Sequence, residues 1–265
     1  MKHISGLMEN IDYSIDKKMD LFSKSKSRYF IRAILACLFL TLGTAVAFAI
    51  AMKGEDITHG LGKMLYAFMF SWSLVMIVYM DAELGTSNMM YMTIGVYTKK
   101  TPLSTALKIL FSCVLFNLIG GLVFGYLVSL TGPFQNLTPD NYLFTAIAGK
   151  LEKSTLQIFI EGIFANIVVN TAVIATLRMK DDGAKVASTI FIIFIFAFLG
   201  FEHVIANFPA FTLAYFASHG TLAAMTTASI LHNLCFAFLG NFVGGGLIIG
   251  LGYAWLNNKE TTYLD

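Results

Sequence analysis

Long stretches of this 265-residue chain contain no acidic or basic side chain. The six longest uncharged runs cover 33–52, 64–80, 109–139, 162–177, 186–201 and 204–258. A helix needs about 20 mostly apolar residues to cross a bilayer. The third run is long enough for a helix near 105–130 and a loop, and the last holds the end of one membrane element, a polar turn and a helix near 231–256. The pattern predicts an all-α integral membrane protein with six transmembrane elements.

The composition agrees with a membrane protein and argues against other classes. Hydrophobic residues make up 57% of the chain and charged residues 13%, about half the ~25% that is typical of soluble domains. This nearly excludes a water-soluble fold. The net charge of +2 does not suggest a nucleic-acid partner. The three cysteines have no CxxC spacing and the histidines no metal-ligand spacing, so we expect neither a metal site nor a cofactor.

The distribution of Lys and Arg predicts the orientation. With the N-terminus inside, fourteen of these residues fall on the cytoplasmic side, and the outer side has only Lys53, Lys63, Lys150 and Lys153. Cytoplasmic loops are enriched in positive charge. We therefore expect a multi-pass protein of the inner (cytoplasmic) membrane, with both termini in the cytoplasm.

Three regions are expected along the chain: a cytoplasmic N-terminal segment over 1–28, a single transmembrane domain over 29–258, and a cytoplasmic tail over 259–265. The first 28 residues lack the apolar core of a signal peptide and should remain uncleaved. Their apolar residues recur at helical spacing, which predicts an amphipathic helix. This helix either lies on the inner membrane surface or packs against the helix bundle.

Elements two and five are short and interrupted. Their uncharged runs are followed by polar interruptions at Asp81–Asn88 and Phe201–Pro209, after which apolar character resumes. Short, interrupted segments at corresponding places in two halves indicate a central site in a transporter or channel built from inverted repeats. Because irregular backbone at membrane depth is tolerated only inside protein or along a cavity, both interruptions should line the pathway.

A repeated motif supports two related halves. The segment 117–121 (NLIGG) recurs as 241–245 (NFVGG), an offset of 124 that also relates Glu83 to Asn207. Three elements in each half, about 29–131 and 154–258, force the halves into opposite orientations. The ends of half-helices carry positive dipole ends, which favour a small anionic cargo.

Three segments resemble the formate/nitrite transporter family: 200–207 (GFEHVIAN), 240–246 (GNFVGGG) and 82–87 (AELGTS). The resemblance covers residues 20–257. It implies an aquaporin-like fold with six membrane elements, two of them broken, assembled as a homopentamer with one pore in each protomer. It also implies a small anion as cargo: formate, nitrite or hydrosulfide.

The resemblance further implies roles for individual residues. His203 matches the family's central pore histidine, Thr86 the threonine opposite it, and Asn207 a nearby pore asparagine. Counting back sixteen residues from the Asn166 match places Lys150 on the lysine of the outer vestibule.

Two hydrophobic constrictions are also implied by the resemblance. Phe70 and Leu74 fall on one of them, Phe196 falls beside the other, and Leu84 belongs to the inner constriction. Formate-type members carry a bulky aromatic where this chain has Gly85. We therefore expect an inner gate that is wider or differently shaped, and the chain most resembles the hydrosulfide-channel branch.

These residues suggest a mechanism. A lone anion faces a cost of tens of kcal/mol in a dry apolar constriction, and its neutral acid does not. We expect Lys150 to concentrate the anion, Thr86 and Asn207 to donate hydrogen bonds to it, and His203 to supply or polarise a proton. Glu202 is expected to orient or cap rather than carry protons.

Other interpretations remain open at this point. His203 is also compatible with a neutral, hydrogen-bonded core histidine. An intramembrane enzyme with Glu202 and His203 as acid and base is a different class, although no nucleophile motif or second acid–base cluster accompanies them. A neutral-solute channel of the aquaporin kind is disfavoured, because the paired Asn-Pro-Ala turns are absent.

Overall fold

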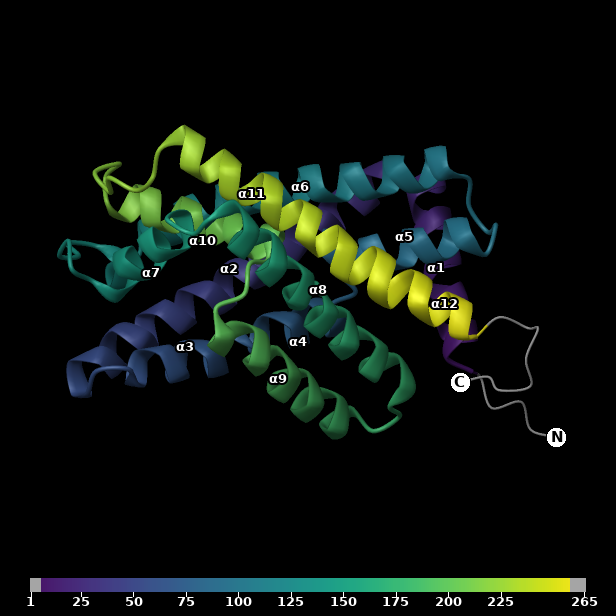
Figure 1. Cartoon of the computed structure of the whole chain (residues 1–265), viewed down its shortest axis with the longest axis horizontal. Helices are drawn as coiled ribbons and strands as arrows, with labels where there is room; N and C mark the ends of the chain where they lie inside the picture. The colour runs from purple at the N-terminus through teal and green to yellow at the C-terminus, as the bar shows by residue number, and fades with distance from the viewer. Residues whose placement is uncertain (1–5, 258–265) are drawn as a thin grey trace.

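A computed structural model of the chain describes residues 6–257 (Figure 1). Every regular element in this range is helical. In chain order the elements are α1 (Leu7–Lys24), α2 (Lys26–Ile57), α3 (Leu61–Phe70), α4 (Trp72–Tyr79), α5 (Gly85–Tyr97), α6 (Leu103–Ser129), η1 (Gly132–Phe134), α7 (Tyr142–Leu151), α8 (Thr155–Arg178), α9 (Asp182–Leu199), α10 (Val204–Ala217), α11 (Thr227–Asn241), η2 (Phe242–Leu251) and α12 (Gly252–Leu256). The predicted tail, 259–265, and the start of the predicted N-terminal segment lie outside the described residues.

Six helical spans in the described part of the chain are long and apolar enough to cross a bilayer. They are α2, α3 with α4, α6, α8, α9, and α11 continued through η2 and α12. The predicted all-α membrane architecture with six elements is therefore confirmed. The second and fifth elements are broken as predicted, because α5 and α10 resume each of them after a short non-helical segment.

The two halves of the bundle interlock. In the first half α2 packs along α3 and α6, and in the second half α8 packs along α9 and α11. The half-helices that follow the breaks cross to the other half: α10 packs against α6, and α5 packs against η2. Each break is therefore enclosed by helices of both halves, as an inverted repeat with a central pathway requires.

The N-terminal helix α1 packs on the helix bundle. Leu7, Ile11 and Ile15 form its buried face and belong to one apolar cluster with Met90 and Ile94 of α5. Of the two predicted placements, the described residues adopt the one against protein. In Figure 1, α1 lies at the same end of the molecule as α12 and opposite α7.

The connection between α6 and α8 contains a further short helix, α7. Asn141 caps α7, because its side-chain oxygen accepts a hydrogen bond from the backbone N–H of Leu143. Leu143, Phe144 and Ile147 are buried on one face of α7. This burial of a short apolar face fixes α7 over the bundle, and its last turn carries Lys150.

The repeated glycines allow membrane helices to approach closely. At Gly244, in the wide π-type turns of η2, a Cβ atom would overlap the carbonyl oxygen of Ile163 on α8. At Gly252, in α12 of the same membrane element, a Cβ atom would meet nothing within 4 Å.

We therefore expect Gly244→Ala to destabilise the protein by about 1–3 kcal/mol, because α8 and η2 must move apart. Gly252→Ala is the matched control and should be neutral or slightly stabilising, since alanine favours helix. Thermal unfolding of the purified, detergent-solubilised variants measures both. Equal melting temperatures for the two variants would contradict the close contact.

Candidate functional site

Asn117 of α6 holds the backbone of the first break. Its Nδ2 donates to the carbonyl oxygen of Glu83 at 2.9 Å and to that of Ala33, on α2, at 2.7 Å. Its Oδ1 accepts from the backbone N–H of Gly85 at 2.8 Å. Backbone groups left unpaired by a helix break are costly at membrane depth. The buried Asn117 side chain satisfies groups on both sides of the break and ties them to α2.

Asn241, at the end of α11, does the same for the second break. Its Nδ2 donates to the carbonyl oxygen of Glu202 at 2.9 Å and to that of Gly162, on α8, at 2.8 Å. Its Oδ1 accepts from the backbone N–H of Val204 at 2.9 Å. The asparagine in each copy of the repeated motif therefore has a polar function, in addition to the close packing of its glycines.

These bonds define how the two breaks correspond. Glu83 and Glu202 each present the carbonyl that the asparagine binds. Two residues before each glutamate the backbone is left-handed, with a φ of 53° at Asp81 and 71° at Gly200. Glu83 therefore corresponds to Glu202, 119 positions later, and its predicted match to Asn207 is wrong.

The repeated motif gives an offset of 124 between the halves, whereas the two glutamates are 119 positions apart, and the reason lies in the connecting chain. The glutamate and the asparagine that binds its carbonyl are 34 positions apart in the first half and 39 in the second. The chain between each break and the following NxxGG motif is therefore longer in the second half. An offset taken from that motif cannot be applied across this connection.

His203 and Thr86 meet at the centre of the molecule. His203 is the N-cap of α10, and its Nδ1 accepts from the backbone N–H of Ala206 at 3.1 Å. Its Nε2 lies 2.8 Å from Thr86 Oγ1. Because a ring nitrogen that accepts an N–H carries no hydrogen, the neutral ring has its hydrogen on Nε2 and donates it to Thr86. The hydroxyl hydrogen of Thr86 is then not used in the contact with His203.

His203 also lines a small central chamber of about 20 Å³. The other lining side chains are apolar except for one serine: Leu40, Phe70, Ser73, Leu74, Ile77, Leu84, Val169, Ile193 and Phe196. A volume of this size admits about one water molecule. The chamber is therefore small and almost dry, and it holds one imidazole.

Two constrictions bound the chamber. Phe70 and Phe196 line both the chamber and an outer cavity, and their ring centroids are 5.8 Å apart. Leu74 and Leu84 line both the chamber and an inner cavity. The expected grouping of Phe70 with Leu74, and of Phe196 with the other constriction, is wrong. Phe70 and Leu74 are about one helical turn, or roughly 5–6 Å, apart along the second element, so they lie at successive levels.

The outer cavity, on the α7 side, has a volume of about 460 Å³ and is lined by the basic residues Lys63, Lys150 and Lys153. Lys150 Nζ donates to Glu202 Oε2 at 3.0 Å, and Lys153 Nζ donates to Glu202 Oε1 at 2.7 Å. Glu202 is fully buried. Lys150 thus lines this cavity and is paired with the acid next to the central histidine.

Asn207 lines the outer cavity rather than the central chamber. Its Nδ2 donates to Glu202 Oε2 and to Asn233 Oδ1, both at 2.8 Å. An amide nitrogen carries two hydrogens, so both are engaged. In this structure Asn207 therefore orients Glu202, and the expectation that it donates a hydrogen bond to the cargo is not met.

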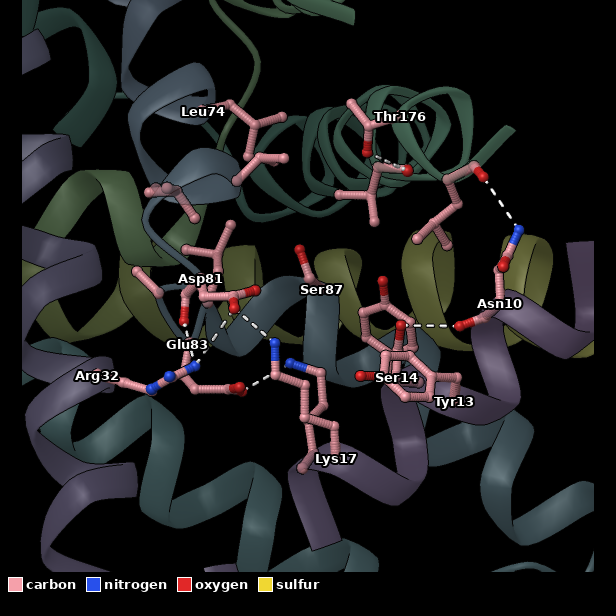
Figure 2. Close-up of a pocket in the computed structure, with 18 of the residues that line it drawn as sticks. Asn10, Tyr13, Ser14, Lys17, Arg32, Leu74, Asp81, Glu83, Ser87 and Thr176 are labelled. Carbon is pink, nitrogen blue, oxygen red and sulfur yellow. Dashed lines mark hydrogen bonds and ion pairs between the residues drawn. The ribbon is translucent and has the colours of Figure 1, made fainter. Parts of the chain in front are cut away.

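The inner cavity, about 370 Å³ in volume, lies between α1 and the first break (Figure 2). Lys17 forms an ion pair with Asp81 across it, and Lys18 Nζ donates to Glu83 Oε2 at 2.7 Å. Arg32 donates to the carbonyl oxygen of Asp81 at 3.1 Å. Burial lowers the pKa of Lys18, but the Glu83 carboxylate outweighs this effect and raises the pKa above its ordinary value. The ammonium therefore stays charged at neutral pH.

Gly85 does not face the inner cavity. A Cβ atom at this position would meet Val114, Asn117 and Ile205, which belong to α6 and α10. A side chain here would therefore press into the helix packing and not into the pathway. The expectation that Gly85 widens the inner gate is not met.

Sequence reasoning missed three residues of this site: Lys18, Lys153 and Asn233, all of which bind a buried glutamate. Lys18 lies in a helix with several other charged residues, and nothing in its spacing marks it. Lys153 and Asn233 reach Glu202 from remote parts of the chain. The one available signal was the pair of acids, Glu83 and Glu202, in apolar surroundings, because buried carboxylates require cationic or hydrogen-bonding partners.

A closed chamber between two polar cavities, inside a bundle of broken membrane helices, defines a membrane channel or transporter. The family model described as Formate/nitrite transporter matches residues 6–255. The chain belongs to the formate/nitrite transporter family.

Individual proteins agree with this assignment. The uncharacterized transporter YwcJ of Bacillus subtilis (strain 168) is 29% identical over 253 residues, which cover 96% of this chain and 98% of YwcJ. A solved FNT family ion channel superposes with a TM-score of 0.86 at 23% identity, covering 94% of this chain and 98% of that one. A structure titled pentameric formate channel with formate bound gives a TM-score of 0.75 at 24% identity, covering 88% and 97%.

The inner cavity offers a matched pair of stability variants. The side chains of Lys18 and Glu83 are 12% and 7% exposed, and those of Lys17 and Asp81 are 43% and 59% exposed. We expect Lys18→Met to cost about 3–5 kcal/mol, because it leaves the Glu83 carboxylate buried without its cation. Lys17→Met should cost less than about 1 kcal/mol.

Unfolding of the detergent-solubilised protein measures this difference. The double variant Lys18→Met/Glu83→Gln should recover much of the loss, since it removes the unpaired charge. If Lys17→Met and Lys18→Met are equally stable, the buried ion pair does not hold α1 against the break.

Proposed function

We propose that this protein is a channel for small monovalent weak-acid anions, with hydrosulfide favoured and formate or nitrite as alternative cargoes of the same pathway. One observation carries the proposal. A chamber of about 20 Å³, bounded by apolar constrictions and lined by His203, whose Nε2 bonds to Thr86, separates two cavities lined by lysines. This arrangement collects anions on each side and excludes them, as ions, from the centre.

Protonation of the anion allows it to pass the apolar constrictions as a neutral acid. Transferring a charged group into an apolar medium costs far more than transferring a neutral one. Hydrosulfide, formate and nitrite are conjugate bases of weak acids, so the anion and a proton from solution can cross the constrictions together as the neutral acid. The proton is released on the far side when the acid ionises again.

Lys150 and the His203–Thr86 pair have separate roles in this proposal. Lys150 raises the concentration of the anion in the outer cavity. Thr86 accepts the Nε2 hydrogen of His203 and donates its hydroxyl hydrogen to the cargo in the chamber. A charged His203 would hold a hydrogen on Nδ1 and lose the bond from Ala206 that caps α10, so the cap favours the neutral ring.

The size of the chamber supports hydrosulfide. About 20 Å³ admits one water-sized molecule. Hydrosulfide has one heavy atom, while formate and nitrite have three, so the larger anions require Phe70 or Phe196 to move. The volume of the chamber, and not Gly85, is therefore the feature that favours hydrosulfide.

An intramembrane enzyme is the alternative class, with Glu202 and His203 as acid and base. Glu202 accepts hydrogen bonds from Lys150, Lys153 and two asparagines. A carboxylate held by two ammonium groups is a poor proton carrier, because both stabilise its ionised form. This supports a transport function over catalysis.

The proposal extends to assembly and location. A homopentamer with one pathway in each protomer is supported by the pentameric structural relative. The excess of Lys and Arg on the α1 side supports an inner (cytoplasmic) membrane protein with both termini in the cytoplasm. Mass determination of the purified detergent complex tests the oligomer.

The identity of the cargo can be tested by flux measurements. Stopped-flow measurements on proteoliposomes at several pH values should give flux above that of empty vesicles, highest for hydrosulfide and lower for nitrite and formate. Phe70→Ala should raise formate flux relative to hydrosulfide flux, because it enlarges the outer constriction.

Phe68→Ala is the control for Phe70→Ala, since Phe68 lies on the same helix but is 45% exposed on the outside of the bundle. Its flux ratio should equal that of the unmodified protein. If none of the three anions moves faster than through empty vesicles, the proposed function is wrong. Equal flux of formate and hydrosulfide would reject the size argument alone.

The part of His203 in transport can be tested by substitution. His203→Leu should change the pH dependence of flux, because it removes the group that polarises the Thr86 hydroxyl. His59→Leu, at a fully exposed histidine outside the pathway, should keep the original profile. A His203→Leu variant with an unaltered pH profile would eliminate the proposed part of this residue in polarising the Thr86 hydroxyl.

A further inference from the structure

Lys153 lies between α7 and α8, and its ammonium group is fully hydrogen-bonded to protein acceptors. Its Nζ donates to Glu202 Oε1 at 2.7 Å, to the carbonyl oxygen of Gly200 at 2.8 Å, and to the carboxylate of Glu161. An ammonium group has three N–H donors. All three are therefore engaged, and Lys153 has no donor left for a cargo.

Lys150 is arranged differently. Its Nζ donates to Glu202 Oε2 at 3.0 Å, and its side chain lines the outer cavity. One bond to Glu202 uses one of three N–H groups, so Lys150 keeps donors that can face an anion in the cavity. The two lysines share a carboxylate but differ in what remains available.

The oxygens of Glu202 explain why both lysines are needed. Oε2 accepts from Lys150, Asn207 and Asn233, whereas Oε1 accepts from Lys153. Removing one partner of a buried ion pair leaves an uncompensated charge, which is strongly unfavourable. Without Lys153, Lys150 would have to satisfy both oxygens, and it would be drawn away from the cavity.

Lys153 also holds the backbone that leads to His203. Gly200 ends α9 in the left-handed conformation, with a φ of 71°, and its carbonyl accepts from Lys153. The same Nζ therefore binds the first and the last residue of the segment 200–202, directly before His203. Burial lowers the pKa of Lys153, but Glu202 and Glu161 outweigh this and raise it above its ordinary value.

Glu161 completes the arrangement. Its Oε2 accepts from Lys153, and its Oε1 accepts from Gln157 Nε2, one turn earlier on α8, at 2.9 Å. Gln157 thus orients Glu161, and Glu161 orients Lys153. This is a chain of contacts from the rigid helix α8 to the second break.

We propose that Lys153 is a positioning residue of the permeation site, which fixes the segment 200–202 and satisfies Glu202 so that Lys150 remains available to the cargo. The inference rests on the proposed channel function. In this arrangement Lys153 determines the maximal transport rate, and Lys150 binds the anion. Glu161 acts only through Lys153.

Concentration series of hydrosulfide and formate flux in proteoliposomes test this division. Lys153→Met should lower maximal flux by about tenfold to a hundredfold, because displacement of the groups that position a site by about 1 Å has effects of this size. Lys150→Met should mainly raise the half-saturating concentration. Lys153→Arg keeps the charge and the donors and should restore most of the maximal flux.

The controls separate this inference from the proposed function. Flux through the unmodified protein comes first: if it equals that of empty vesicles, the channel function fails. If the unmodified protein conducts and Lys153→Met changes only the half-saturating concentration, or nothing, then Lys153 does not position the site. Lys153→Gln, which retains an N–H donor, decides the result if Lys153→Met does not fold. If neither is recovered folded, Lys153 is a residue of stability and the inference is wrong.

Discussion

Breaking a helix at the depth of a membrane exposes backbone N–H and C=O groups where water cannot reach them. In this protein one asparagine in each half solves the problem for one break. Asn117 and Asn241 each bind groups before and after the break and a carbonyl oxygen of a third helix. The central residues depend on these bonds, since Thr86 directly follows Gly85 and His203 lies between Glu202 and Val204. A precise His203–Thr86 distance requires that both breaks be rigid.

The backbone of the two breaks is symmetric, but the side chains are not. Leu84 and His203 occupy the corresponding N-cap positions of α5 and α10, and both line the central chamber. One half therefore contributes an apolar side chain and the other an imidazole. In each break, one cation binds the glutamate side chain and a second cation donates to the carbonyl oxygen of the left-handed residue. In the first break these cations are Lys18 and Arg32. In the second break they are Lys150 and Lys153. The symmetric cations allow anions to approach from either side, and the asymmetric centre provides a polar group.

Much of this architecture could be predicted from the sequence, because burial in a membrane restricts where charges lie. The uncharged runs locate six spans, and the acids and the histidine that interrupt them locate both breaks. The partners of those acids could not be predicted. Lys18 reaches Glu83 from a separate helix, and Asn233 reaches Glu202 from α11. Such contacts depend on how helices cross, which has no local sequence pattern.

A buried carboxylate next to an anion pathway requires a reason, because Glu202 repels the cargo. Conduction requires that an ion bind well enough to enter and weakly enough to leave. Two lysines without a counter-charge would form a strong anion site in a partly desolvated cavity, and the cargo would stay there. Glu202 and Glu161 offset the ammonium charges of Lys150 and Lys153, and of these two lysines Lys150 is the one that keeps donors for an anion. In the proposed channel, the acid next to His203 therefore limits how tightly the vestibule holds an anion, and this allows release toward the chamber.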